Sequence, residues 1–451
     1  MRVGSLVVAF LVLGCDGERA QKTTQPKPSS VGDANTNDGG LEAYGFLDAP
    51  PGSLDGLYAG FAAAEKSEIT GRTLMLFFGD SHTAGDAMTS HLRIELQHRF
   101  GDAGRGLVAA GKAPTQHYYQ RDIKYGRSGV WSAAVGGHRG DSEPFGIAGL
   151  RVFGKRKGAQ LWVETCADCP AGKTTAQFEI LYYAAPDHGE LRYRVDEGAW
   201  QTLATKTQAI EPPHPARQVV PVEDGPHKLT LEHAGGGVVD LFGVVLERLK
   251  PGVIVESLGV VGRRLGSLRS WDWAIIGDQL ATRDPKLVVL QYGTNEADDP
   301  DLVLEDVAKY YDDMIARIHA AAPGASILIL GPPDVGVREG GKSCDRPKHG
   351  DAGVSPECEW RTPQVLRDII AVQHAAAVRN HVAFFDTFAA MGGADRMHEW
   401  VTAEPRVAYK DHVHFSDIGY QHWADALSSA LLADYARWRQ GTGLPPSKAG
   451  N

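Results

Sequence analysis

The sequence predicts an α/β protein in which a parallel sheet lies between two layers of helices and is interrupted by an inserted all-β domain. Three observations support this prediction. Short apolar runs alternate with segments of helical spacing near both ends of the 451-residue chain. The runs are apolar enough for strands that are buried on both faces. In the middle of the chain, the helical segments give way to short strand-like runs.

The α/β elements are predicted in chain order. The apolar and partly aromatic run from Thr73 to Phe78 indicates a buried strand. Residues 86–100 follow with helical spacing at Met88, Leu92 and Leu96. Further strands are predicted at "VIVESLG", "KLVVLQYG", "SILILG" and "HVAFFD", with helices near residues 304–321, 363–379 and from residue 417 onward.

The middle region, residues 149–250, shows partial period-two alternation. Runs such as "QLWVETC", "AQFEILYYA" and "HKLTLEH" are separated by clusters of Gly, Pro and Asp. This spacing predicts a β-sandwich or jelly roll. Because "VIVESLG" resumes the earlier pattern, the β-domain is expected to divide the α/β domain into residues 46–148 and 251–445.

Composition and charge exclude one class of partner. With 43% hydrophobic and 23% charged residues, the chain has the composition of a folded globular protein. Its formal net charge is -10, and no basic stripe is present. Binding to nucleic acid needs a basic surface, so we expect no nucleic-acid partner.

The N-terminus predicts export. Arg2 precedes the apolar run Leu6–Leu13, which ends in "VLGC". This is typical of a bacterial lipoprotein signal peptide, here residues 1–14, cleaved before a lipid-bearing Cys15. The alternative is an ordinary secretory signal with an incidental cysteine. Residues 15–45 are largely polar and rich in Pro, Ser and Thr, which predicts a flexible tether to a bacterial membrane on the periplasmic or envelope side.

Four cysteines follow the tether, namely Cys166, Cys169, Cys344 and Cys358. In an oxidising compartment, their even number predicts disulfides, most simply between the first two and between the last two. Free thiols and a four-cysteine zinc site are the alternatives. The zinc site is disfavoured because the second pair lacks the tight spacing of a zinc knuckle.

The stretch "FFGDSHTAGD" places Ser81 between a strand and a helix, at the carboxyl end of the sheet, where ligands bind in α/β proteins. Most serines in such a position only cap a helix. A candidate base lies in "KDHVHFSDIGY", where Asp411 and His414 would meet on a helical turn. His412 competes for this role. The non-catalytic alternative is a solvated loop that caps the last helix through Asp417.

Two further segments end strands with residues that can donate hydrogen bonds. In "VESLGVVGRRLGS", no side chain blocks approach to the backbone N–H of Gly262. In "VVLQYGTNEADD", the Asn295 amide follows a buried strand and can donate to a developing oxyanion. Each is more often just a turn residue, so the prediction depends on the set as a whole.

The order Gly-Asp-Ser-His, glycine, Gly-Thr-Asn and Asp-x-x-His resembles the SGNH (GDSL-like) hydrolase superfamily. The resemblance implies a three-layer, flavodoxin-like sheet. It also implies that Ser81 is the nucleophile and that His414 is the base with Asp411 behind it. Gly262 and Asn295 would donate to the oxyanion together with the serine amide.

The nearby "GDAGRGLVAAG" and the inserted β-domain are similar to bacterial peptidoglycan O-acetylesterases with a jelly roll like a carbohydrate-binding module. One departure is Glu296, where the superfamily usually carries aspartate. The resemblance implies removal of acetyl groups from an acetylated envelope glycan, such as O-acetylated peptidoglycan, without metal or cofactor. Alternatives are a polysaccharide O-acetyltransferase, a lipase or thioesterase, and a non-catalytic glycan-binding lipoprotein. The sugar, the ester position and the oligomeric state stay open.

Several side chains near the serine are candidate substrate contacts, namely His82, Tyr118, Tyr119 and Trp131. Aromatic rings can stack on sugar faces, although packing between the two domains explains these residues equally well. Trp162 and Trp200 belong to the inserted domain, where we expect them in the strand core.

Overall fold

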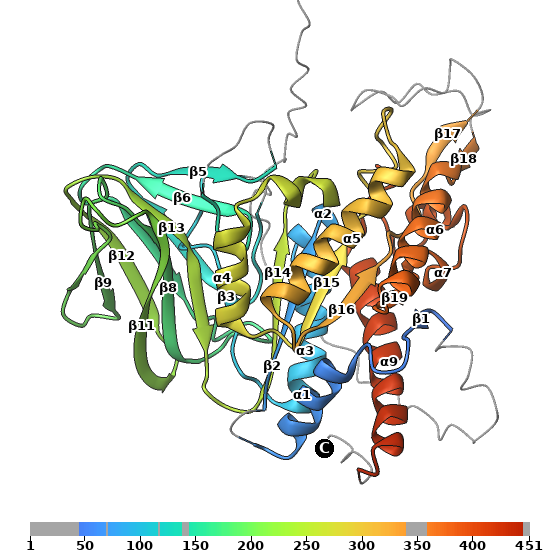
Figure 1. Cartoon of the computed structure of the whole chain (residues 1–451), viewed down its shortest axis with the longest axis horizontal. Coiled ribbons are helices and arrows are strands. Elements are labelled where there is room, and N and C mark those ends of the chain that lie inside the picture. Colours follow the sequence, from blue (N-terminus) through green and yellow to red (C-terminus); the bar gives the residue numbers. More distant parts are fainter. Residues whose placement is uncertain (1–44, 69–70, 116–117, 138–143, 340–358, 445–451) are drawn as a thin grey trace, which may run out of the picture. The chain divides into compact units, whose positions relative to one another are not determined.

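A six-stranded sheet forms the centre of the α/β part of the protein (Figure 1). The structure is a computed structural model that describes residues 45–68, 71–115, 118–137, 144–339 and 359–444. The strand order is β1-β19-β16-β15-β2-β14, and every neighbouring pair is parallel except β1 with β19. The strands are Leu47–Asp48 (β1), Arg72–Gly79 (β2), Gly252–Gly259 (β14), Leu287–Gln291 (β15), Ser326–Leu330 (β16) and Ala383–Phe385 (β19).

Alternate residues of these strands pack into two separate hydrophobic cores. Met75 and Phe77 of β2 pack with helices α1, α3 and α9, whereas Leu74 and Leu76 pack with α4, α5 and α6. The sheet therefore has a helix layer on each face, and the mixed α/β fold predicted from the sequence is confirmed. These helices are Asp55–Glu65 (α1), Ala87–Phe100 (α3), Trp273–Arg283 (α4), Leu304–Ala321 (α5), Gln364–Arg379 (α6) and Asp417–Gly441 (α9).

Two antiparallel sheets occupy the region between α3 and β14 (Figure 1). One has the order β10-β9-β12-β7-β4, and the other has the order β11-β8-β13-β6-β5, with β3 also paired to β13. The strands are Gly106–Val108 (β3), Lys124–Ser128 (β4), Ser132–Val135 (β5), Leu150–Gly154 (β6), Gln160–Glu164 (β7), Thr175–Ala184 (β8), Glu190–Val195 (β9), Gln201–Ala204 (β10), His214–Gly225 (β11), Lys228–Gly235 (β12) and Val239–Glu247 (β13).

The sequence pattern predicted that the inserted domain begins at residue 149, but the inserted sheets already include strands before that residue. Strand β4 pairs with β7, and strand β5 pairs with β6. Their sequences, "KYGRS" and "SAAV", consist mainly of polar or small residues. Because neither strand alternates apolar with polar side chains, the period-two pattern does not reveal them.

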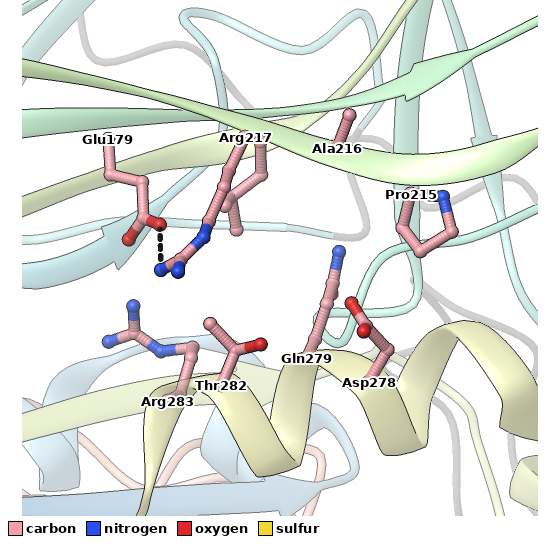
Figure 2. A pocket seen from close by; sticks show the side chains of 9 residues that line it. Glu179, Pro215, Ala216, Arg217, Asp278, Gln279, Thr282 and Arg283 are labelled. Carbon is pink, nitrogen blue, oxygen red and sulfur yellow. Dashed lines mark hydrogen bonds and ion pairs between the residues drawn. The ribbon is translucent and has the colours of Figure 1, made fainter.

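Buried ion pairs of Arg283 link α4 to strand β14 of the central sheet and to strand β13 of the insertion. Arg283 of α4 pairs with Glu256 of β14 and lies 3.6 Å from Glu247 of β13. Beside these pairs, a cavity of about 300 Å³ lies between α4 and strands β8 and β11. Figure 2 shows Arg217 of β11 pointing toward α4, and its guanidinium donates to Glu179 at 3.0 Å.

The short elements are α2 (Ser81–Ala84), η2 (Leu265–Ser270), α7 (Thr387–Ala390), α8 (Arg396–Thr402), β17 (Val337–Glu339) and β18 (Glu359–Arg361). The disulfide predicted between Cys166 and Cys169 is confirmed. Cys344, Cys358, the signal peptide with Cys15 and nearly all of the tether lie outside the described residues. Within the described ranges, no helix combines the length and the apolar character that crossing a bilayer requires.

Candidate active site

Ser81 lies at the carboxyl end of β2, on the sharp corner between the strand and α2. Asp80 caps this short helix, because its Oδ1 accepts a hydrogen bond from the His82 N–H at 2.9 Å. A side chain at Gly79 would collide with Thr83, so the glycine allows α2 to pack tightly against the strand end. The Ser81 N–H lies in the first turn of α2, where the helix itself offers no hydrogen-bond acceptor for backbone N–H groups.

The structure brings Ser81, His414 and Asp411 into one chain of hydrogen bonds. The Ser81 Oγ lies 2.8 Å from the His414 Nε2. The His414 Nδ1 lies 2.7 Å from the Asp411 Oδ2. When Nδ1 donates to the carboxylate, Nε2 is left to accept the serine proton. The arrangement is therefore suited to nucleophilic catalysis assisted by a general base.

Asp411 and His414 meet in a hairpin turn, whereas the choice of His414 from the sequence considered a helical turn. The Asp411 Oδ1 accepts hydrogen bonds from the N–H groups of Val413 and His414, each at 3.0 Å. The Tyr409 N–H donates to the His414 carbonyl at 2.8 Å and closes the hairpin. One carboxylate oxygen thus shapes the turn, while the other orients the imidazole.

The competing base, His412, points away from the serine. Its Nε2 lies 2.9 Å from the His398 Nδ1, and its ring stacks on Trp360 with 3.3 Å between ring centres. Burial lowers the pKa of His412 to about 4. His412 is therefore a neutral packing residue in this structure.

The charged groups around His414 favour its role as a general base. Burial alone would lower the pKa of His414, but the hydrogen bond and the charge of Asp411, together with the charge of Asp80, raise it above its ordinary value. Burial alone would raise the pKa of Asp411, but its bonds with the His414 side chain and with backbone N–H groups hold it at about 2. Asp411 is thus ionised at neutral pH, and it stabilises the imidazolium that forms when His414 takes a proton.

Gly262 lies in the turn that follows β14. The Arg263 N–H donates to the Val260 carbonyl at 3.2 Å, and Gly262 occupies the third position of this turn with φ +74°. A positive φ at this position favours glycine. An added Cβ would meet nothing within 4 Å, so the space around Gly262 is open.

Asn295 lies beside the Gly262 turn. Its Nδ2 donates to the Arg263 carbonyl at 2.9 Å, and the Arg264 Nε donates to the Asn295 carbonyl at 3.0 Å. These two contacts tie the loop after β15 to the loop after β14. An asparagine amide carries two donor hydrogens, so one remains for a ligand.

Glu296, at the position where the resemblance leads one to expect aspartate, links the same two loops. Its Oε1 accepts from the Leu265 N–H at 2.8 Å, and its Oε2 accepts from the Gly293 N–H at 3.0 Å. Burial raises the pKa of Glu296 above its ordinary value, although these backbone donors oppose the shift. The longer side chain spans the two loops and satisfies both buried donors.

Asp80 and His82 are the buried titratable neighbours of Ser81. Burial raises the pKa of Asp80 to about 7, and the His82 backbone N–H opposes this shift. Burial also lowers the pKa of the His82 side chain well below its usual value, and the charge of His414 adds to this effect. His82 is therefore uncharged, whereas Asp80 titrates near neutral pH.

Two of the predicted substrate contacts are wrong. His82 is fully buried, and its Nδ1 lies 3.2 Å from the Tyr420 hydroxyl. Trp131 is buried in the inserted region, where its ring centre lies 6.4 Å from that of His233. Side chains of successive residues point in different directions, so nearness to Ser81 in sequence does not place a side chain at the site.

The two predicted tyrosine contacts differ from each other. The Tyr118 hydroxyl donates to the Ser257 carbonyl at 3.1 Å, so this side chain packs against β14. Tyr119 is 43% exposed, and its N–H donates to the carbonyl of Ala84 in α2 at 3.3 Å. Of the four predicted contacts, Tyr119 alone combines an exposed side chain with attachment to the helix of the serine.

The expectation that Trp162 and Trp200 belong to the strand core is wrong. Both side chains are only partly buried. The Lys228 Nζ lies 4.6 Å from the Trp162 ring centre, and the guanidinium carbons of Arg192 and Arg194 lie 4.6 and 4.9 Å from a Trp200 ring centre. Each indole is thus covered by cations on a solvent-facing side of the insertion.

A buried ion network behind the site was missed in the sequence. Asp86 accepts hydrogen bonds from Arg93 at 2.8 Å and from Arg105 at 2.6 Å. It also accepts from the Arg121 N–H at 2.8 Å, which fixes the segment that carries Tyr119. Burial alone would raise the pKa of Asp86, but the two guanidinium groups hold it below its ordinary value. Asp86 and Arg105 lie in "GDSHTAGD" and "GDAGRG", but neither motif shows that they pair.

No group of three or more His, Cys, Asp or Glu side chains in the described ranges is arranged to hold a metal ion. The reactive groups around Ser81 are a hydroxyl, an imidazole, carboxylates and backbone N–H groups.

Residues 225–422 match the model of the GDSL-like lipase/acylhydrolase family. This segment contains Gly262, Asn295, Asp411 and His414, but Ser81 precedes it. No curated protein matches the chain. Among three solved structures, one is similar in fold. A peptidoglycan O-acetylesterase is 23% identical, with 87% of this chain and 99% of that chain covered and a TM-score of 0.68.

The other two structures are much less similar. The acetyl xylan esterase AlAXEase is 17% identical over 40% of this chain and 80% of its own, with a TM-score of 0.28. A family two carbohydrate esterase from Cellvibrio japonicus is 10% identical over 69% of this chain and 98% of its own, with a TM-score of 0.24. Residues 225–422 are thus similar to GDSL-like lipases and acylhydrolases, and the fold of the chain is similar to that of a peptidoglycan O-acetylesterase.

Proposed function

We propose that this protein is a serine O-acetylesterase that removes acetyl groups from an envelope polysaccharide, with O-acetylated peptidoglycan as its substrate. The observation that carries the proposal is the hydrogen-bonded chain from Ser81 Oγ through His414 to Asp411. Gly262 and Asn295 lie on adjoining loops that can offer oxyanion donors. The solved structure with a TM-score of 0.68 is a peptidoglycan O-acetylesterase, and this supports the choice of substrate.

In the proposed mechanism, the His414 Nε2 takes the proton of Ser81 while the serine oxygen attacks the acetyl carbonyl. The negative charge on the carbonyl oxygen is held by the N–H groups of Ser81 and Gly262 and by the Asn295 amide. His414 then returns the proton to the departing sugar hydroxyl, which leaves an acetyl-serine. Water, activated by the same imidazole, releases acetate and restores the serine.

The openness of the site supports a short acyl group on a large substrate. The side chains of His414 and Asp411 are 30% and 36% exposed. A lipase would need an apolar cleft for a long acyl chain, and the nearest groups here are carboxylates, imidazoles and backbone amides. An acetyl group carried by a polymer needs only a shallow surface on which the sugar chain can lie.

The inserted sheets and the N-terminus extend the proposal to the whole chain. The insertion is proposed to be a jelly roll like a carbohydrate-binding module, which is consistent with its two antiparallel sheets. Cys15 is proposed to carry a lipid that anchors the protein to a bacterial membrane, facing the periplasm or envelope. Labelled palmitate that enters the wild type but not Cys15→Ser would support the anchor. Equal labelling of both proteins would refute it.

The test of the enzymatic proposal measures acetate released from O-acetylated peptidoglycan by the purified protein. Ser81→Ala removes the nucleophile, and we expect it to abolish release. Ser132→Ala makes the same chemical change at an exposed serine of β5, and we expect it to leave the rate at the wild-type value. A short aryl acetate and an added acceptor glycan are included in parallel assays.

Each outcome identifies a different function. Acetate release that depends on Ser81 supports the proposal. Turnover of the aryl acetate without release from peptidoglycan refutes this substrate and favours another acetylated glycan. Transfer of acetyl to the acceptor glycan without release of acetate indicates a transferase. No turnover of either substrate refutes the enzymatic proposal and favours a transferase or a non-catalytic binding protein.

A further inference from the structure

Among the described residues, two aromatic side chains are more than about a third exposed. They are Tyr119 at 43% and Tyr409 at 53%. The other exposed large apolar side chains in the described ranges are aliphatic, namely Val130, Ile210, Val219, Leu249, Val303 and Val378. Both tyrosines are attached by backbone hydrogen bonds to the elements that carry the triad. Single exposed apolar side chains are common on protein surfaces, so it is the attachment of these two rings to the elements of the triad that points to a ligand.

Tyr409 lies opposite the base in the hairpin of Asp411 and His414. Its N–H donates to the His414 carbonyl, and the next pair, Ala408 and Phe415, forms an antiparallel bridge. Residues directly opposite each other in such a pair place their side chains on the same face. Ala408 and Phe415 are buried, so the alternation turns Tyr409 and His414 to the other face, where Ser81 lies.

Tyr119 lies beside the nucleophile. Its N–H donates to the carbonyl of Ala84, the last residue of α2, and Ser81 is the first residue of that helix. Tyr118 points inward to β14, which leaves the Tyr119 ring on the outer side of the segment. The next turn of this segment is fixed as well, because the Arg121 guanidinium lies 2.5 Å from the carboxylate of Asp417.

We infer that Tyr119 and Tyr409 form a sugar-binding subsite in which their rings stack on the glycan that carries the ester. This inference rests on the proposed function and specifies how the polymer is held. A rigid ring with a polar edge suits the apolar C–H face and the hydroxyl rim of a pyranose. Because one tyrosine is attached to the helix of the serine and the other to the hairpin of the base, a stacked sugar would be held at the reacting oxygen.

The surroundings of the two rings favour a sugar over an acyl chain. Lys410 and Asp411 follow Tyr409 and are exposed, and the ion pair of Arg121 with Asp417 lies near Tyr119. A fatty acyl chain lying across these residues would remove charged groups from water and would offer them no hydrogen bonds in return. Sugar hydroxyls can instead bond with the same charged groups.

The experiment compares kcat and KM for acetate release from O-acetylated peptidoglycan with the same constants for 4-nitrophenyl acetate. The variants are Tyr119→Ala, Tyr409→Ala, their double mutant and the two Tyr→Phe forms. We expect each alanine variant to raise KM for the glycan about 3- to 10-fold, with a smaller change in kcat. The phenylalanine forms keep the ring and should restore KM to within about twofold. Ile210→Ala, at a side chain that is 89% exposed between β10 and β11, is the control and should match the wild type.

The outcomes separate this inference from the proposed function. If the wild type releases no acetate from peptidoglycan, the proposed function fails. If the wild type does release acetate, the ratio of kcat/KM for peptidoglycan to kcat/KM for 4-nitrophenyl acetate decides about the subsite. Alanine variants that keep the wild-type ratio would refute the subsite alone. A loss that grows with acyl length across 4-nitrophenyl acetate, butyrate and octanoate would assign the rings to acyl binding and would also overturn the inference.

Discussion

The carboxylate of Glu296 accepts a hydrogen bond from the backbone N–H of Leu265 at 2.8 Å. Its second oxygen accepts from the Gly293 N–H at 3.0 Å. One buried side chain therefore joins the loop that carries Gly262 to the loop that carries Asn295. The relative position of the two proposed oxyanion donors depends on this carboxylate.

Glu296→Ala should lower both activity and stability. The substitution leaves two buried N–H groups without an acceptor, and each costs about 1–3 kcal/mol of unfolding free energy. We expect kcat for 4-nitrophenyl acetate to fall by about 10²-fold, because a displaced oxyanion donor no longer stabilises the transition state. Glu296→Gln keeps one acceptor oxygen, so its kcat and its unfolding free energy should lie between those of the wild type and those of Glu296→Ala. Steady-state kinetics and urea unfolding measure these effects, and a wild-type kcat for the alanine variant would contradict the assignment.

Asp411→Asn should lower the rate and shift its pH dependence. The acid limb of kcat/KM reports the deprotonation of His414 in the free enzyme. Because Asp411 raises the pKa of His414, the wild-type limb should lie above about pH 6.5. In Asp411→Asn it should move to lower pH, while kcat falls by about 10²- to 10⁴-fold. A pH-rate profile from pH 5 to pH 9 measures both effects.

His412→Asn is the control for this shift. Asparagine tolerates the positive φ of this position, and the ring that is removed points toward His398 and Trp360. We expect the acid limb to stay at the wild-type pH. If His412→Asn moved the limb and Asp411→Asn did not, His412 would be the functional neighbour of the base.

The sequence predicted the parts of the site that follow buried parallel strands. Ser81 follows β2, Gly262 follows β14 and Asn295 follows β15, and these three strands are neighbours in the sheet. Their carboxyl ends therefore meet at one edge, and this result needs only the apolar runs and the parallel order. No long-range side-chain contact has to be known for this prediction.

Features that depend on contacts between distant residues were not predictable. The spacing of Asp411 and His414 fits a helical turn as well as a hairpin, and the hydrogen bonds of the Asp411 Oδ1 decide between them. Trp162 has the apolar character of a core residue. Its indole instead lies over Gly126 of the neighbouring strand, where a Cβ would collide with the ring, and the sequence does not reveal this contact.

Asp80→Asn should change how stability depends on pH. The pKa of Asp80 is raised from 3.8 to about 7 in the folded protein, so the folded state binds this proton more tightly than the unfolded state does. Ionisation of Asp80 therefore lowers the unfolding free energy as the pH rises from about 4 to 7. Asparagine also caps helices but carries no charge. The stability of the Asp80→Asn variant relative to the wild type should therefore increase from about pH 4 to pH 7.

Urea unfolding at pH 5, 6, 7 and 8 measures the Asp80 effect. Asp386→Asn provides a matched control, because Asp386 caps α7 by accepting from the Ala389 N–H at 2.9 Å. A constant difference between Asp80→Asn and the wild type from pH 5 to pH 8 would show that Asp80 does not titrate in this range.

Arg93→Met should destabilise the protein far more than Arg121→Ala, although both remove an arginine that pairs with an aspartate. Arg93 is fully buried and pairs with both Asp86 and Asp122, so its loss removes the guanidinium bound to Asp122 and one of the two bound to Asp86, and it should cost about 3–5 kcal/mol. The Arg121 side chain is 42% exposed, and its pair with Asp417 should contribute less than about 1 kcal/mol. Urea unfolding at pH 7 compares the two variants. Equal losses would show that the Asp86 network does not depend on Arg93, because Arg105 and the Arg121 N–H would then satisfy Asp86 without it.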